Sequence, residues 1–400
     1  MSELVRRKKP EVKLSRRQAI KASLSDTNDL SSSMGDDDYT PNDLSAGMMS
    51  EHFSSGDDAP VLKKRKSITE TLNKAPKKDH YTPIDTSMVV STGSTLLDLA
   101  ISGGRIRGGG CPGGIMIELH GPSGSGKTAL AVDIAASIQN KGGEADILDP
   151  EARLDKEYAR IYGLELDKKN YSQPKLVTEV FNSIYKWDPP NKKVINGKII
   201  DSIAALVSAK EMEDGGDKRG QRKAKDLHEG CRKSSVVLAE GGHKLIIFTN
   251  HEMDGEYGKI TPGGKAVPYY ASLRIRIAQK EKLMPEKKMA SGKMVKMVTG
   301  VLSLCTVVKN SIDNGFRDAP LYIIYGQGID DVRANLQWYK QMMNSTKYIA
   351  CDKEYQRLDF AIKYIEDNDL EGELREDVID LWEEIQEKFK TTRKKVKVRF

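Results

Sequence analysis

One short motif restricts the fold of this chain more than any other feature. Residues 121–128 read GPSGSGKT, between an apolar run at 115–119 and a helical stretch at 128–139. Glycines let successive backbone N–H groups turn toward one anion, and the start of a helix adds its positive dipole end. The motif GxxxxGK[ST] between a strand and a helix therefore predicts a phosphate-binding loop in an α/β fold. Its residues are Gly121, Pro122, Ser123, Gly124, Ser125, Gly126, Lys127 and Thr128.

The surrounding sequence supports this fold class. Short apolar runs alternate with helical stretches from about residue 91 to 327, which is typical of a mostly parallel sheet covered on both faces. Candidate buried strands are 115–119, 145–149, 245–249, 273–277 and 321–325. We expect three parts along the chain. They are a mostly disordered, charged N-terminal region at 1–82, a P-loop core at 83–330, and a small helical region with a basic tail at 331–400.

The composition excludes several classes of protein. With 64 Lys and Arg against 58 Asp and Glu, the net charge is +6, which is too small for the dense positive field of a histone-like protein. The four cysteines lie far apart without a CxxC pair, so neither a zinc cage nor a disulfide framework is expected. No apolar run reaches the ~18 residues that cross a bilayer. We therefore expect a soluble, cytoplasmic protein without membrane contact.

A nucleotide hydrolase needs acidic side chains beside its phosphate-binding loop, and two later strand ends supply them. Glu151 follows the strand expected at 145–149, at the edge of the sheet where it can orient a water molecule. Asp201 follows another apolar run and would hold Mg²⁺ through water, beside the hydroxyl of Thr128. Lys127 would reach the β- and γ-phosphates of ATP. Taken alone, each carboxylate is more often a helix N-cap, but their order after the motif favours the catalytic interpretation.

Several longer strings occur in the order found in RecA recombinases. They are STGSTLLD (91–98), DPEARLDKEYAR (149–160), DSIAAL (201–206), LIIFTNH (245–251), GGKAVPYYAS (263–272), VKN (308–310) and IYGQG (324–328). Over about residues 91–330 the chain resembles a RecA-family homologous-recombination ATPase. His251 stands where most bacterial RecA proteins have glutamine and UvsX-type viral recombinases have histidine. The chain is therefore most similar to the viral members.

This resemblance implies a RecA-like P-loop core that binds ATP with Mg²⁺, and it assigns roles to residues. Glu151 activates the hydrolytic water, and His251 senses the γ-phosphate at the root of the loop that follows it. Lys309 matches a lysine that reaches the ATP of the neighbouring subunit. The further nucleotide contacts that it implies are Asp155, Tyr158 and Tyr325. On composition alone, core or interface packing is the commoner role for either tyrosine.

The resemblance also implies an activity. It is that of a DNA-dependent ATPase that forms a helical filament on single-stranded DNA and exchanges strands with double-stranded DNA in recombination and repair. A single-strand-binding protein and a loader are further expected partners. The histidine suggests a bacteriophage protein acting in the host cytoplasm. A RecA-fold accessory protein without strand exchange is the alternative, and a ring-forming helicase is a weaker one.

Two stretches match the DNA-binding loops of that family. The first, 214–225, is basic and rich in glycine, and it leads into a helix on which three polar side chains share one face. A solvated charged helix is the alternative interpretation. The second, 252–262, ends at a Gly-Gly-Lys turn that suits a phosphate, and its tyrosine can stack between bases. The residues assigned to DNA are Lys218, Arg219, Arg222, Lys223, Lys225, His228, Arg232, Tyr257, Gly263, Gly264 and Lys265.

Four departures from the family pattern weaken this assignment. Residues 196–200 read NGKII, so this strand is expected to be short or bulged. Ser311 stands where a second lysine often occurs, which is expected to weaken catalysis between subunits. Glu252 and two further acids in the second loop would repel phosphates. The usual polymerisation segment is not recognisable, and 68–72 or 83–90 is expected to replace it.

Overall fold

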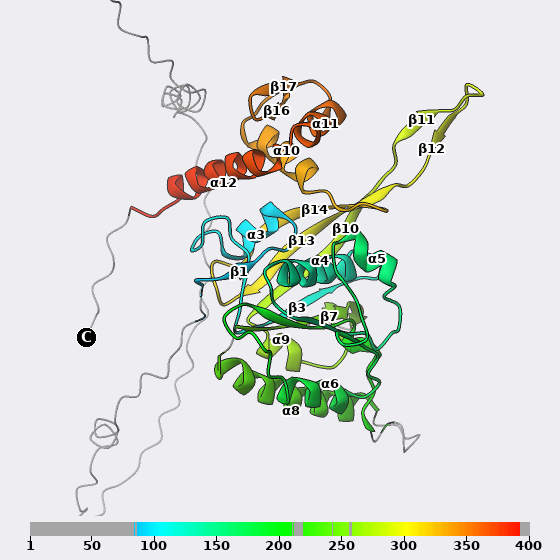
Figure 1. Ribbon diagram of the computed structural model, residues 1–400, viewed down its shortest axis with the longest axis vertical. Helices are drawn as coiled ribbons and strands as arrows, with labels where there is room; N and C mark the ends of the chain where they lie inside the picture. Colours follow the sequence, from blue (N-terminus) through cyan, green and yellow to red (C-terminus); the bar gives the residue numbers. More distant parts are fainter. Residues whose placement is uncertain are drawn as a thin grey trace, which may run out of the picture. The chain divides into compact units, whose positions relative to one another are not determined.

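A nine-stranded sheet organises the chain in the computed structural model (Figure 1). The structure describes residues 84, 86–209, 211, 219–241, 243–255 and 258–392. The strands lie in the order β15-β14-β13-β10-β3-β7-β6-β4-β5. They are β3 (Ile115–Gly121), β4 (Ala145–Leu148), β5 (Tyr171–Ser172), β6 (Asn196–Ile200), β7 (Lys244–His251), β10 (Leu273–Leu283), β13 (Gly300–Asn310), β14 (Asp318–Ile324) and β15 (Gly328–Ile329).

The larger part of this sheet is parallel. Every pairing from β5 across to β10 is parallel, whereas β13, β14 and β15 continue the sheet antiparallel. The register of the two central strands pairs Gly121 of β3 with His251 of β7. The carboxyl ends of the parallel strands therefore meet at one edge, beside the phosphate-binding loop. The α/β prediction is confirmed, although the run at 321–325 lies in the antiparallel part.

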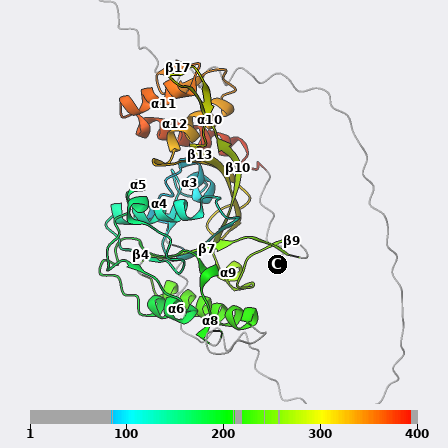
Figure 2. The same ribbon diagram turned by 90° about the vertical axis from the view of Figure 1, so that its right-hand side faces the viewer.

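Helices cover both faces of the sheet, as Figures 1 and 2 show. On one face lie α3 (Thr95–Ser102), α4 (Lys127–Asn140) and α5 (Lys156–Ile161); on the other lie α6 (Val177–Tyr185), α8 (Arg219–Ala239) and α9 (Ala266–Tyr270). Successive side chains of a strand point to opposite faces, and two hydrophobic cores result. Ile117 and Ile247 belong to the first core, whereas their neighbours Met116 and Phe248 belong to the second.

The strand β6 differs from the expectation of a short or bulged strand. It pairs in unbroken register with β7 over Asn196–Ile200 and with β4 over Gly197–Ile200. Its glycine lets α4 approach closely, since a Cβ at Gly197 would lie 2.5 Å from Cδ1 of Ile138. The buried amine of Lys198 lies 2.6 Å from the Asp146 carboxylate. Packing and an ion pair, which the local sequence does not reveal, therefore complete the strand.

The segment after the sheet contains three helices and a strand pair. They are α10 (Asp331–Met342), β16 (Tyr348–Ala350), β17 (Lys353–Tyr355), α11 (Leu358–Asp367) and α12 (Glu371–Lys388). The expectation of a helical region therefore missed the hairpin β16–β17. The carboxylate of Asp331 accepts hydrogen bonds from the backbone N–H and the hydroxyl of Thr95, at 2.7 and 2.6 Å. These contacts join α10 to α3.

The remaining elements are short strand pairs. β1 (Val89–Val90) pairs with β2 (Cys111–Pro112), so part of the 83–90 segment is bound within its own chain. The alternative polymerisation segment, 68–72, lies outside the described residues. The hairpin of β11 (Glu286–Lys288) and β12 (Met294–Lys296) extends the β10–β13 pair (Figure 1). None of the four cysteines forms a disulfide, as expected. No helix within the described residues is long and apolar enough to span a membrane.

Candidate functional site

The phosphate-binding loop lies between β3 and α4, as the motif predicts. Gly126 has a φ of 97°, and a Cβ there would lie 2.4 Å from Cδ1 of Ile323. Both the backbone conformation and the close approach therefore require glycine. The amine of Lys127 donates to the carbonyl oxygens of Gly121 and Pro122, at 3.1 and 2.8 Å. Burial lowers the pKa of Lys127, although the carboxylates of Asp201 and Glu151 oppose this shift.

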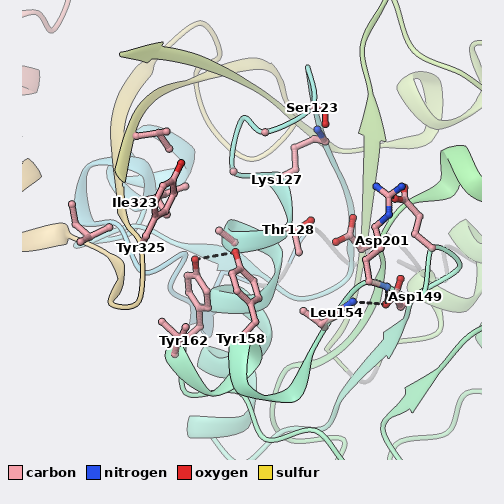
Figure 3. Close-up of a pocket in the computed structure, with 18 of the residues that line it drawn as sticks. Ser123, Lys127, Thr128, Asp149, Leu154, Tyr158, Tyr162, Asp201, Ile323 and Tyr325 are labelled. Carbon is pink, nitrogen blue, oxygen red and sulfur yellow. Dashed lines mark hydrogen bonds and ion pairs between the residues drawn. The ribbon is translucent and has the colours of Figure 1, made fainter. Parts of the chain in front are cut away.

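A cavity of about 610 Å³ opens beside this loop (Figure 3). Figure 3 shows Tyr158, Tyr162 and Tyr325 on one side of Thr128, and the acids Asp149 and Asp201 on the other. The aromatic end suits the flat face of a base, and the loop and acid end suits phosphates and a cation. The lining residues are Ser123, Gly124, Gly126, Lys127, Thr128, Ala129, Asp149, Glu151, Arg153, Leu154, Tyr158, Ile161, Tyr162, Asp201, His251, Val301, Ile323, Ile324, Tyr325 and Gly326.

Asp201 lies directly after β6, next to the first turn of α4. Its carboxylate accepts hydrogen bonds from the hydroxyls of Thr249 and Thr128. Burial raises the pKa of Asp201, and these two hydrogen bonds partly counter the shift. A buried carboxylate beside a threonine hydroxyl is an oxygen donor pair of the kind that Mg²⁺ prefers. The residues present therefore fit a magnesium ion bound with nucleotide phosphates.

Glu151 lies in the loop after β4 and has three polar partners. Its Oε1 accepts from the hydroxyl of Ser202 at 2.5 Å and lies 3.4 Å from Nε2 of His251. Its Oε2 lies 2.8 Å from a guanidinium nitrogen of Arg153. Burial alone would raise the pKa of Glu151, but the hydrogen bonds from Ser202 and His251 and the charge of Arg153 lower it below its usual value. The carboxylate is therefore held ionised, as a general base requires.

The structure brings most of the predicted nucleotide residues together. Those that do not line the cavity are Gly121, Pro122, Ser125, Asp155 and Lys309, and the last two have other contacts. Asp155 caps α5, because its carboxylate accepts from the backbone N–H groups of Glu157 and Tyr158 at 3.1 and 3.2 Å. The amine of Lys309 donates to the carbonyls of Pro268 and Tyr269 in its own chain, at 3.1 and 2.7 Å. Neither residue lines the cavity.

The lining residues that the sequence did not reveal include two with polar contacts inside the cavity, Tyr162 and Arg153. Tyr162 caps the C-terminus of α5 four residues after Tyr158, and their hydroxyls are 3.1 Å apart. This helical spacing is a signal that could have found it. Arg153 lies two residues after Glu151, and no local pattern marks its ion pair with that carboxylate.

The first predicted DNA-binding stretch ends in α8. Lys225, His228 and Arg232 are exposed on this helix, and the ring of His228 packs edge-on against Tyr270 at 5.4 Å. Lys223 turns inward, where its amine donates to the carbonyl of Ala204 at 2.7 Å. Burial lowers the pKa of Lys223. Arg222 is half-buried on the same helix. Lys218 and the side chain of Arg219 lie outside the described residues.

The second predicted DNA-binding stretch follows β7. It contains β8 (Met253–Gly255) and β9 (Gly258–Ile260), which form a hairpin, and Tyr257 lies outside the described residues. Gly263 and Gly264 have φ values of 90° and 74°, and Lys265 precedes the first turn of α9. The amide of Asn250 donates to the carbonyl of Pro262 at 3.2 Å, which ties the end of the stretch to β7.

Glu252 was expected to repel phosphates, but its carboxylate is not exposed at the surface. Its side chain is only 5% exposed, and its two oxygens accept from Nε and a terminal nitrogen of Arg276, both at 2.8 Å. Nδ1 of His120 lies 3.4 Å away. The hydrogen bond from Arg276 lowers the pKa of Glu252, although burial opposes it. The acid therefore anchors the start of the stretch, and its repulsion of phosphates is largely cancelled.

Comparison with known proteins identifies the family. The model of the RecA N-terminal domain matches residues 75–330. Protein RecA of Thermus thermophilus is 33% identical over 253 residues, covering 61% of this chain and 69% of that protein. Protein RecA of Rippkaea orientalis is 32% identical over 293 residues, covering 70% of this chain and 78% of that protein. Protein RecA of Synechocystis is 31% identical over 293 residues, with coverages of 70% and 77%.

These matches span the phosphate-binding loop, both acidic strand ends and both predicted DNA-binding stretches. The similarity to viral recombinases stays a prediction. The resemblance to RecA recombinases is confirmed, together with the α/β fold that it implied. The chain belongs to the RecA family of recombinases.

Proposed function

We propose that this chain assembles as a helical filament on single-stranded DNA and exchanges strands with double-stranded DNA, using ATP and Mg²⁺. The observation that carries the proposal is the position of His251. It contacts Glu151 in the nucleotide cavity and directly precedes the second predicted DNA-binding stretch. A change in the contacts of the phosphates would therefore be transmitted through His251 to the stretch that would contact DNA.

Different residues of the cavity would bind different parts of ATP. The loop N–H groups and Lys127 would hold the phosphates, while Tyr158 and Tyr325 would flank the base. Thr128 and Asp201 would hold Mg²⁺, which neutralises phosphate charge when bound. In hydrolysis, a water oxygen bonds to the γ-phosphorus, the bond to the leaving ADP oxygen breaks, and Glu151 accepts the proton of the water.

The residues after β7 support the coupling of ATP to DNA. Asn250, His251 and Glu252 are consecutive, and each contacts a different part of the molecule. His251 is the one that reaches the catalytic carboxylate. Loss of the γ-phosphate would therefore change the contacts of His251 while its two neighbours keep the stretch attached. We propose that ATP orders the DNA-binding stretches and that hydrolysis relaxes them.

A RecA-fold accessory protein without strand exchange is the second candidate. Lys309 favours it, because its amine is engaged by two carbonyl oxygens of its own chain rather than extended toward a neighbour. Ser311 in place of a second lysine favours it as well. A single-strand-binding protein and a loader are proposed partners of either candidate. A bacteriophage origin, with action in the host cytoplasm, remains part of the proposal and is supported by the histidine at 251.

Removal of the phosphate-loop lysine tests nucleotide binding. Lys127→Ala is expected to weaken ATP binding by roughly 100-fold, because one partner of a largely buried charge contact is lost. Isothermal titration with a non-hydrolysable ATP analogue measures this change. Lys169→Ala, at an exposed lysine before β5, is the matched control and should bind normally. Unchanged affinity in Lys127→Ala would refute the phosphate role.

Substitution of the proposed base tests the hydrolytic step. Glu151→Gln keeps the size of the side chain but cannot accept the proton of a water molecule. We expect turnover to fall between about 10²- and 10⁴-fold while ATP and DNA affinity stay within about twofold. Phosphate release in the presence of single-stranded DNA measures the rate. Glu157→Gln, on the exposed side of α5, is the control. Full turnover in Glu151→Gln would remove Glu151 from this role.

The salt dependence of DNA binding tests whether the exposed face of α8 contacts DNA. Lys225→Ala/Arg232→Ala removes two cationic side chains from this face. If both contact phosphates, the slope of log affinity for single-stranded DNA against log salt concentration decreases by roughly 1.4, about 0.7 per contact. Lys168→Ala/Lys169→Ala makes the same change of charge at the far edge of the sheet. An equal effect of the two double variants would mean that only net charge matters.

Filament formation and strand exchange distinguish the two candidate functions. With ATP, Mg²⁺ and a circular single strand, we expect long regular filaments in electron micrographs and joint molecules with a homologous linear duplex. Lys127→Ala is expected to give neither, since both need bound ATP. Isolated particles that bind ATP and form no joint molecules would favour the accessory protein, and closed rings would favour a helicase.

A further inference from the structure

Arg153 is a charged residue of the nucleotide cavity whose role remains to be assigned. Its backbone is firmly held, because Oδ2 of Asp149 accepts from the N–H groups of Arg153 and Leu154, both at 2.8 Å. The hydroxyl of Tyr171 donates to the same oxygen at 2.9 Å. The side chain of Arg153, by contrast, is 79% exposed and lines the cavity. The backbone of Arg153 is therefore fixed, whereas its guanidinium can change partners.

The partner of Arg153 in this structure is the catalytic carboxylate. Oε1 of Glu151 is held by Ser202 at 2.5 Å and approached by His251 at 3.4 Å, and Oε2 is held by Arg153 at 2.8 Å. Both oxygens are thus engaged. The guanidinium occupies one side of Oε2, and its positive charge makes that oxygen a weaker acceptor for the proton of a water molecule. The ion pair of Arg153 and Glu151 is therefore a restraint on the proposed base.

The terminal phosphate of ATP is a strong competitor for this guanidinium. Among the described lining residues, Lys127 and Arg153 are the Lys and Arg side chains, and Lys127 is buried against its own loop. The planar fork of an arginine matches a phosphate as well as a carboxylate, and a phosphate carries more charge. ADP ends one phosphate earlier and so lacks the group nearest to the hydrolytic end of the cavity.

We propose that Arg153 is a positioning residue whose guanidinium is shared between Glu151 and the terminal phosphate of ATP. A bound triphosphate draws Arg153 away from Oε2 and releases that oxygen for the water, whereas ADP leaves the ion pair closed. The proposal rests on the proposed ATPase function and deepens it. Through Arg153, the ability of Glu151 to accept a proton would depend on the presence of the γ-phosphate.

The first test compares two nucleotides. We expect Arg153→Gln to bind a non-hydrolysable ATP analogue roughly tenfold more weakly, because a charge-assisted contact is lost, while ADP binding changes less than about twofold. Arg153→Lys keeps the charge and is expected to recover part of the difference. Arg160→Gln is the matched control, since Arg160 pairs with Glu157 on α5 and does not line the cavity. Titration calorimetry with Mg²⁺ measures all four proteins.

The second test is the pH profile of kcat/KM, which reports the pKa of Glu151 in the nucleotide-free protein, where the ion pair is closed, and which a merely structural role would not move. The positive charge of Arg153 is one cause of the lowered pKa of Glu151. Turnover needs the ionised carboxylate, which is present above its pKa and is lost as the pH falls through it. In Arg153→Gln the pKa rises, so the acidic limb is expected to move to higher pH. In Arg153→Lys the limb is expected to stay near its wild-type position.

Three results would overturn the proposal. Equal weakening of the ATP analogue and ADP would mean that Arg153 only maintains the cavity. Unchanged affinities in Arg153→Gln would mean that the phosphate does not compete for it, and an unmoved acidic limb would mean that it does not act on Glu151. The two binding measurements need no DNA. A wild-type protein that discriminates the nucleotides but exchanges no strands would refute the proposed function and leave the role of Arg153 standing.

Discussion

A fully buried carboxylate holds together the part of the fold on which the nucleotide cavity depends. Glu118 lies on the central strand β3, with Oε2 2.6 Å from Nε of Arg274 on β10 and Oε1 3.1 Å from the amide of Asn250 on β7. A buried charge without partners would be very costly, so these three strands cannot shift independently. Because the phosphate-binding loop follows β3 and His251 follows Asn250, the same contacts fix the position of His251 relative to that loop.

The same edge of the sheet carries a second buried acid, and together the two attach both ends of a predicted DNA-binding stretch. Asn250 bridges Glu118 to the carbonyl of Pro262 at the end of the stretch, and Glu252 at its start is paired with Arg276. The ends of the stretch are therefore attached to the sheet, and the hairpin lies between these two attachment points. A rigid base with a protruding hairpin suits a segment whose order depends on ligands.

Local motifs predicted what depends on local sequence, and contacts distant in sequence decided the rest. Glycine spacing and strand ends located the loop at 121–128, Glu151 and Asp201, whereas the resemblance to RecA recombinases singled out His251. The pairing of Glu252 with Arg276 was missed, since the two are 24 residues apart on different strands. Arg153 was missed because its role depends on the ion pair with Glu151, which the local sequence does not reveal.

The contacts at the root of the second predicted DNA-binding stretch differ in how easily they can open. Glu252 is 5% exposed and doubly bonded to Arg276, so separating them would leave a buried charge unpaired. His251 is 32% exposed and lies 3.4 Å from Glu151, a long and weak contact that opens at little cost. Of these contacts, the one that the His251 side chain makes with Glu151 would therefore open first when the phosphates change. The backbone at the root of the stretch stays fixed, and the hairpin beyond it is the part left to respond.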